Sequence, residues 1–217
     1  KSEIIPRPMT IVALGDSTTA GTPGFRSPLE APPDGAGNIE SQYAFWLTKA
    51  HPEWRVLNRG INGERSDQIR ARFARDVIDE AADLVVIIAG VNDIYQGRPA
   101  EQVEAELEAM FALARSAPRT LSIVAGSIMP FDTATVEQNR RMHVVNDWLR
   151  SYSTSHPDVA FCDTRVAVSS PLDPDRLLSS PDGLHPSPEG YRLAAVALEP
   201  VICGAFQGRG KKERRLR

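Results

Sequence analysis

The sequence predicts a three-layer α/β fold in which a parallel sheet lies between two layers of helices. Short apolar runs and helical patterns alternate five times along the chain, which is typical of doubly wound sheets. Several runs are nearly continuous in Val, Ile and Leu, as expected of parallel strands that are buried on both faces. The length of 217 residues, with 41% apolar residues, suits one domain with a sizeable core.

Five apolar runs are the predicted strands of a parallel sheet. They lie at Thr10–Leu14, Arg55–Asn58, Leu84–Ala89, Leu121–Ala125 and Val159–Cys162. Because crossovers between parallel strands are right-handed, the carboxyl ends of all five strands are expected at one edge of the sheet. Ligands bind at that edge in folds of this class.

The segments between these runs carry helical patterns. Apolar residues recur at helical spacing over 69–77, 103–114 and 142–152. The last helix has a clear beginning, because Ser187 suits the N-cap and Pro188 the first helical position. We expect a single domain over residues 1–208, followed by a basic C-terminal tail at 209–217.

Charge and composition exclude several classes of protein. The tail is basic, but the rest of the chain is acidic and carries no recognition motif, so no nucleic-acid partner is expected. The apolar runs are too short to span a membrane. Cys162 and Cys203 make neither a disulfide framework nor a metal site, and they favour the cytoplasm. The absence of an initiator Met leaves a secreted or periplasmic location open, and a homo-oligomer stays open as well.

Residues suited to chemistry follow the first three predicted strands. Ser17 lies in the turn after the first strand, Gly63 in the segment after the second, and Asn92 directly after the third. A serine at such a turn presents its hydroxyl to the edge of the sheet, and backbone or side-chain amides nearby can donate to the same space. Each residue also has an ordinary structural alternative, as a helix cap or as part of a turn.

The strongest local signal is the segment from Asp182 to His185. A carboxylate three residues before a histidine can fold back through a turn and accept from Nδ1, which leaves Nε2 free to act as a base. The other histidines, His51, His143 and His156, lack comparable neighbours and are interpreted as structural or solvated.

Taken together, four segments resemble the SGNH (GDSL-type) hydrolase family. They are GDST at 15–18, NRGING at 58–63, GVND at 90–93 and DGLH at 182–185, in that order along the chain. The resemblance runs from about Thr10 to Val201. It implies a flavodoxin-like sheet with strand order 2-1-3-4-5.

The resemblance also implies the roles of individual residues. Ser17 would be the nucleophile, His185 its base, and Asp182 the residue that orients His185. The backbone N–H groups of Ser17 and Gly63, with the Asn92 side chain, would form the oxyanion hole. No metal and no cofactor are expected.

The expected substrate is a small-molecule carboxylic ester. We expect small acyl groups, as in acetylated carbohydrates or simple aryl and alkyl esters, cleaved through an acyl-serine intermediate. A lysophospholipase or an acyl thioesterase of the same family is the enzymatic alternative. A catalytically silent binding module is the alternative of another class, although such a protein should have lost at least one of the reactive groups.

The segment Gly21–Gly37, rich in Pro and Gly, begins four residues after Ser17. Long loops in compact domains are usually functional or disordered. We expect Phe25 and Leu29 to wall the acyl or leaving-group pocket, with Arg26 at its mouth. The alternatives are that these residues pin the loop to its own domain or meet another subunit.

Overall fold

The computed structural model describes residues 7–215, of which 207–215 are described by their backbone alone. Its centre is a parallel sheet of five strands in the order β4 (Trp54–Gly60), β1 (Met9–Gly15), β5 (Leu84–Ile88), β6 (Ser122–Gly126) and β7 (Val159–Cys162). In chain order this is 2-1-3-4-5, so the predicted sheet is confirmed. Each of the five predicted runs lies on one of these strands, with ends that differ by at most two residues.

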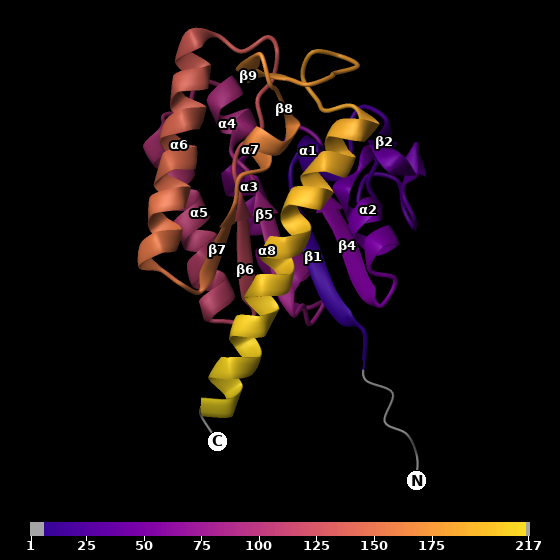
Figure 1. Ribbon diagram of the computed structural model, residues 1–217, viewed down its shortest axis with the longest axis vertical. Coiled ribbons are helices and arrows are strands. Elements are labelled where there is room, and N and C mark those ends of the chain that lie inside the picture. Colours follow the sequence, from indigo (N-terminus) through magenta and orange to yellow (C-terminus); the bar gives the residue numbers. More distant parts are fainter. Residues whose placement is uncertain (1–6, 216–217) are drawn as a thin grey trace.

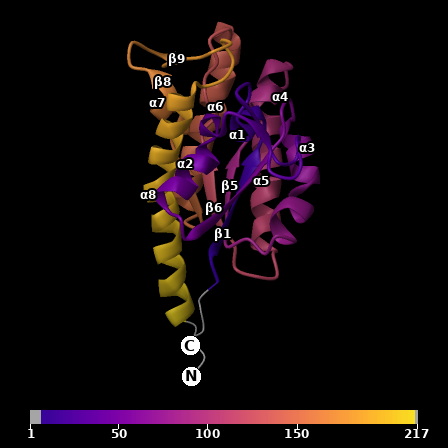
Figure 2. The same cartoon turned by 90° about the vertical axis from the view of Figure 1, so that its right-hand side faces the viewer.

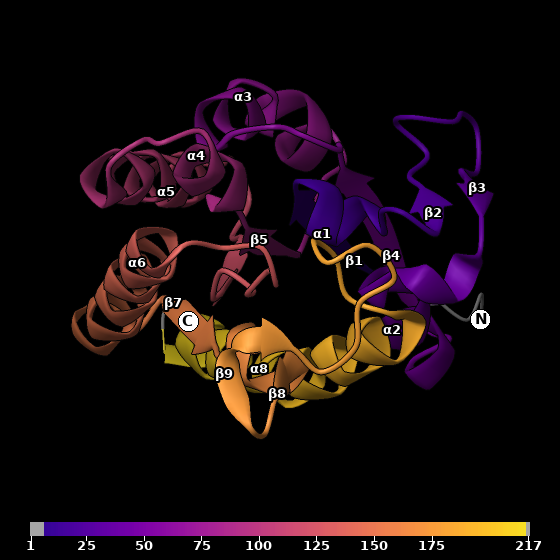
Figure 3. The ribbon, with the colours of Figure 1, turned by 90° about the horizontal axis from the view of Figure 1, so that it is seen from above.

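Helices cover both faces of the sheet (Figures 1 and 3). One face is packed by α3 (Ser66–Ala71), the π-helical turn η2 (Ala74–Ile78), α5 (Ala100–Arg115) and α6 (Val136–Ser155). The opposite face is packed by α2 (Tyr43–Ala50) and the long α8 (Pro188–Arg215). Seen from the side, the sheet lies between α8 and α5 (Figure 2). The three-layer arrangement therefore follows from two separate apolar cores.

The remaining elements are short and lie mainly beside the carboxyl ends of the strands. The helical ones are α1 (Ser17–Ala20), η1 (Ile39–Ser41), α4 (Val91–Tyr95) and α7 (Thr164–Val168). Two small antiparallel hairpins join β2 (Phe25–Arg26) to β3 (Ala36–Gly37), and β8 (Ser169–Ser170) to β9 (Asp173–Leu177).

Two helical segments differ from the expected pattern. The stretch over 69–77 is interrupted, because α3 ends at Ala71 and the chain continues into the π-helical turn, yet its predicted apolar face is buried. The last helix begins at Pro188 as predicted and continues through Arg215. It therefore includes most of the basic segment at 209–217, whose last two residues lie outside the described part of the chain. Among the described helices, none is long and apolar enough to cross a bilayer.

The strand register brings three chain segments to one edge of the sheet. Gly15, the last residue of β1, pairs with Gly60 on one side and with Ile88 on the other. Gly60 also has to be small, because a Cβ there would lie 2.1 Å from the backbone nitrogen of Ala20. This close approach packs α1 against the end of β4 and places Ser17 next to the segments that follow β4 and β5.

Candidate active site

The turn after β1 presents Ser17 as the first residue of α1. Asp16 caps this helix, and its Oδ1 accepts from the backbone N–H and the hydroxyl of Thr18, each at 2.9 Å. Ser17 is 4% exposed, so its hydroxyl lies in a recess rather than on an open surface.

The loop between β9 and α8 brings a histidine and a carboxylate to Ser17. His185 Nε2 lies 3.0 Å from Ser17 Oγ, and His185 Nδ1 lies 2.7 Å from Asp182 Oδ2. Because an ionised carboxylate can only accept, Nδ1 carries the hydrogen and Nε2 is left to accept from the serine hydroxyl. Seen from above, this loop passes beside α1 (Figure 3). The three predicted residues thus form a serine–histidine–aspartate chain that can move a proton away from Ser17.

Asp182 is held in its ionised form by local hydrogen bonds. Partial burial works in the opposite direction, but the bond to His185 and the backbone N–H groups of Leu184 and His185 together lower the pKa of Asp182. Both amides lie 2.9 Å from Asp182 Oδ1. The carboxylate is therefore oriented before any substrate arrives, and it fixes the orientation of His185.

Two further donors lie close to this chain. Asn92 is the second residue of α4, and its Nδ2 donates one hydrogen bond to the Glu64 carbonyl at 2.9 Å. The second hydrogen on that nitrogen remains for another acceptor. Gly63, whose φ of +79° favours glycine, lies directly before Glu64. The segment after β4 and the start of α4 are therefore joined next to Ser17.

These groups border one cavity of about 170 Å³. Its polar lining includes Ser17, Asn92 and His185, with Thr18 and Asn62. The apolar lining comes from α4, from the segment after β6 and from the β9–α8 loop: Val91, Tyr95, Met129, Pro130, Phe131 and Leu184. Gly63 is not among the lining residues, although its neighbour Asn62 is. The structure thus brings Ser17, Asn92 and His185 to a common space with an apolar wall.

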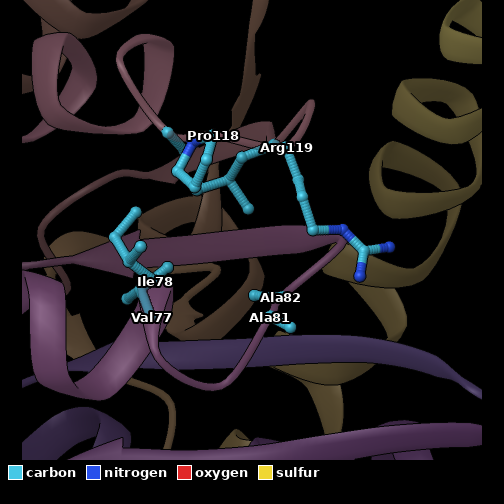
Figure 4. A pocket seen from close by; sticks show the side chains of 8 residues that line it. Val77, Ile78, Ala81, Ala82, Pro118 and Arg119 are labelled. Carbon is cyan, nitrogen blue, oxygen red and sulfur yellow. The ribbon is translucent and has the colours of Figure 1, made fainter.

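A second hollow lies at the other end of the sheet. It encloses only about 20 Å³ between η2 and the segment that precedes β6, and its labelled lining includes Val77, Pro118 and Arg119 (Figure 4). Because Ala82 lies two residues before β5 begins, this hollow is near the amino ends of the strands. It is far too small for a substrate, and it lacks the residues predicted to be reactive.

The residues of the loop 21–37 that were predicted to wall the pocket lie elsewhere than its described lining. Phe25, Arg26 and Leu29 are absent from the described lining of the cavity. Phe25 is 4% exposed because the β2–β3 hairpin folds the loop onto itself, and its ring packs against Gly35. Arg26 donates to the Glu30 carbonyl at 2.8 Å, also within the loop. Phe25 and Arg26 therefore make contacts within their own loop, and none of the three residues borders the described cavity.

The loop does contact the site through another residue. The Glu30 carboxylate accepts from the backbone N–H of Asn62 at 2.8 Å and from that of Ser27 at 2.9 Å. Glu30 thus supports the segment after β4, a role that the sequence did not indicate. The apolar wall at 129–131 was also missed, although its position directly after β6 could have indicated it.

The other three histidines lie away from the cavity. His51 lies between Glu53 and Glu199, at 3.0 and 2.8 Å. His143 pairs with Asp175, and the His156 ring contacts the Tyr152 carbonyl at the end of α6. Their partners hold surface elements together, in agreement with the structural interpretation.

Asp16 is a buried carboxylate with a strongly altered acidity. Burial raises the pKa of Asp16 to about 6, despite the two hydrogen bonds from Thr18. Its Oδ2 has no hydrogen-bond partner among the described residues. The pKa of Asp16 in the folded protein lies above the reference value of 3.8. The contribution of Asp16 to the free energy of unfolding is therefore fully present below pH 3.8 and is lost as the pH rises through about 6.

We therefore expect Asp16→Asn to change the pH dependence of stability. Asn keeps an acceptor for Thr18 but cannot ionise. Relative to the wild type, the variant should gain about 2 to 3 kcal/mol of unfolding free energy between pH 4 and pH 8, because a shift of one pKa unit is worth about 1.4 kcal/mol. Urea unfolding at the two pH values measures this difference. An equal effect of the substitution at both values would show that Asp16 does not titrate in this range.

Comparisons with known proteins agree with this geometry. The profile of the GDSL-like lipase/acylhydrolase family matches residues 13–193. An acetylxylan esterase from Geobacillus stearothermophilus is 29% identical over 187 residues, which cover 77% of this chain and 84% of that protein.

Two solved structures show the same fold. A member of the lipolytic protein G-D-S-L family from Veillonella parvula superposes with a TM-score of 0.73 at 20% identity, covering 90% of this chain and 98% of the other. A carbohydrate acetylesterase family member from Sinorhizobium meliloti gives 0.68 at 19% identity, covering 92% and 99%. Since the family profile spans most of the chain and includes all four sequence segments that form the site, the protein belongs to the GDSL-like lipase/acylhydrolase family, the SGNH hydrolases, and is a carboxylic ester hydrolase.

Proposed function

We propose that this hydrolase cleaves esters of small acyl groups through an acyl-serine intermediate. Ser17 attacks the acyl carbonyl while His185 Nε2 accepts its proton, and His185 returns that proton to the leaving alkoxide. A water molecule then attacks the acyl-serine, with His185 again acting as the base. Asp182 holds the imidazole in the required tautomer. The observation that carries this proposal is the hydrogen-bonded chain from Asp182 through His185 to Ser17.

The developing oxyanion needs donors that are already in place. We assign this role to the backbone N–H groups of Ser17 and Gly63 and to the free hydrogen on Asn92 Nδ2. Asn92 and Ser17 line the same cavity. Gly63 lies between Asn62, which also lines the cavity, and Glu64, whose carbonyl accepts from Asn92.

The dimensions of the cavity support a small acyl group. A dry cavity of about 150 Å³ in another protein accommodates benzene, so the 170 Å³ here suits an acetyl group with part of its alcohol. Met129 and Phe131 are 1% and 2% exposed and close the apolar side. Acetylated carbohydrates are the favoured natural class, since the chain resembles a protein named as an acetylxylan esterase.

An acyl-length series tests the size limit. With p-nitrophenyl esters, we expect kcat/KM to be highest for acetyl to butyryl esters and to fall for longer chains, because each methylene without a place in the pocket forfeits about 1–3 kcal/mol. Acetylated xylo-oligosaccharides should release acetate in parallel assays. Values of kcat/KM that rise steadily toward palmitoyl would instead favour a lysophospholipase.

A pair of exposed residues provides a matched comparison. Tyr95 is 57% exposed and lines the cavity, whereas Leu172 is 95% exposed on the turn between β8 and β9. Tyr95→Ala should alter kcat/KM unequally across the series, while Leu172→Ala should leave the profile unchanged. Equal profiles for the two variants would contradict a role of Tyr95 in the pocket.

A further inference from the structure

A buried arginine lies beneath the segments that carry the assigned oxyanion donors. Arg72 follows α3, and its side chain is 7% exposed. Its Nε donates to Glu64 Oε2 at 2.6 Å, and one terminal nitrogen donates to the Gly15 carbonyl at 2.8 Å. The other terminal nitrogen donates to the Arg59 carbonyl at 2.8 Å and to Asp76 at 2.6 Å. One guanidinium therefore joins the ends of β1 and β4 to the segment that follows β4.

Glu64 connects this arginine to the donors themselves. Its carboxylate accepts from Arg72, and its carbonyl accepts from Asn92 Nδ2 at 2.9 Å. Its backbone follows directly on Gly63. Gly15, the carbonyl partner of Arg72, lies two residues before Ser17. Asn92 and Gly63 are thus one hydrogen-bonded or covalent step from Glu64, and Ser17 is three steps from Arg72, by way of Gly15 and Asp16.

The charges around Arg72 favour one fixed arrangement of the Glu64, Arg72 and Asp76 side chains. Asp76 is 3% exposed and accepts from both Arg72 and Arg75, so the buried guanidinium faces two carboxylates, from Glu64 and from Asp76. The planar guanidinium also has its donors in a rigid arrangement, which makes the distances between its partners hard to change.

We propose that the Glu64–Arg72 pair is a positioning device for the oxyanion hole. This rests on the proposed function, because it requires that Asn92 and Gly63 act as the donors. Donors contribute to catalysis only when they are held at hydrogen-bond distance from the place where the charge develops, and small displacements have large effects on rate. Neither Glu64 nor Arg72 is among the described residues that line the cavity; they fix Asn92 and the Gly63 backbone relative to Ser17.

Glu64 is the better residue to change, since removal of the buried Arg72 could prevent folding. Glu64→Ala should lower kcat for p-nitrophenyl acetate about 10- to 100-fold, with KM changed less than about threefold. Glu64→Gln keeps an acceptor for Arg72 and should restore most of the lost kcat. Glu106→Ala is the matched control, because the Glu106 side chain on α5 is 23% exposed, close to the 18% of Glu64, and it pairs with Arg70 of α3, which does not line the cavity.

A double-mutant cycle separates positioning from general damage. If Glu64 acts by holding Asn92, Glu64→Ala should cost much less in kcat when Asn92 is already Ala. Three results would overturn the proposal: a decrease in kcat for Glu64→Ala no larger than that for Glu106→Ala, an increase in KM with kcat unchanged, or effects of Glu64→Ala and Asn92→Ala on kcat that are fully additive. These outcomes are distinct from failure of the proposed function, in which wild-type activity would persist after Ser17→Ala.

Discussion

Ser17→Ala and His185→Ala should each lower kcat for p-nitrophenyl acetate by about 10⁴- to 10⁶-fold, and the double variant should be little worse than either one. The 3.0 Å contact between Ser17 Oγ and His185 Nε2 is the reason, because the two side chains share one proton transfer. Without the histidine the hydroxyl keeps its proton, and without the hydroxyl the histidine has no proton to accept. Steady-state kinetics of the three variants measure the effect.

Two measurements make this prediction specific. Asp182→Asn should lower kcat by about 10⁴-fold, since it disturbs the tautomer of His185 while leaving Ser17 in place. Ser180→Ala is the control in the same loop: its hydroxyl donates to the His185 carbonyl at 2.7 Å and lies 3.4 Å from Asp182 Oδ1, but it is not bonded to the imidazole or to Ser17 among the described residues. The Ser180→Ala variant should lose about tenfold or less in kcat. If the losses of Ser17→Ala and His185→Ala multiplied in the double variant, the two residues would not act in one step.

A fluorophosphonate probe examines the nucleophile directly. The wild type should become labelled at Ser17, because only a serine activated by a neighbouring base reacts readily. His185→Ala should label far more slowly, and Ser17→Ala not at all. Labelling that persists in Ser17→Ala would place the reactive serine elsewhere in the chain.

The fold and the placement of Ser17, Asp182 and His185 beside one another could be predicted because both depend on short segments of sequence. Apolar runs of four to six residues are enough to identify buried parallel strands, and the topology then brings the residues after each strand to one edge of the sheet. The contact of Asp182 with His185 is local, across three residues. Ser17 and His185 lie 168 positions apart, yet the strand-end rule and the family resemblance indicated both.

The walls and supports of the site could not be predicted in the same way. Phe25 was expected in the pocket but packs within its own hairpin, which could not be foreseen because strands of only two residues give no periodic signal. Arg72 lies within a helical pattern rich in charges, where a solvated side chain is the ordinary expectation; its burial depends on carbonyls from β1 and β4. Such positions are determined by contacts between distant segments, and a single sequence does not show them.

Loss of the Asn92 amide should have the next largest effect on catalysis. Asn92→Ala should lower kcat by about 10²- to 10³-fold with little change in KM, because the hydrogen bond forms fully only when charge develops on the carbonyl oxygen. Asn92→Asp should be at least as damaging, since it replaces the donor by an acceptor of the same shape. Kinetics with p-nitrophenyl acetate measure both variants.

Asn62 is the matched control for this experiment, because it is the same residue type, lines the same cavity and is not assigned as a donor. Asn62→Ala should change KM more than kcat. Affinity for a boronic acid that forms a tetrahedral adduct with Ser17 should fall with kcat in Asn92→Ala, because the adduct places an oxygen where the oxyanion develops. Asn92→Ala could instead weaken substrate binding and boronate binding equally and leave kcat unchanged. Asn92 would then be a binding residue, and the backbone N–H groups of Ser17 and Gly63 alone would have to stabilise the oxyanion.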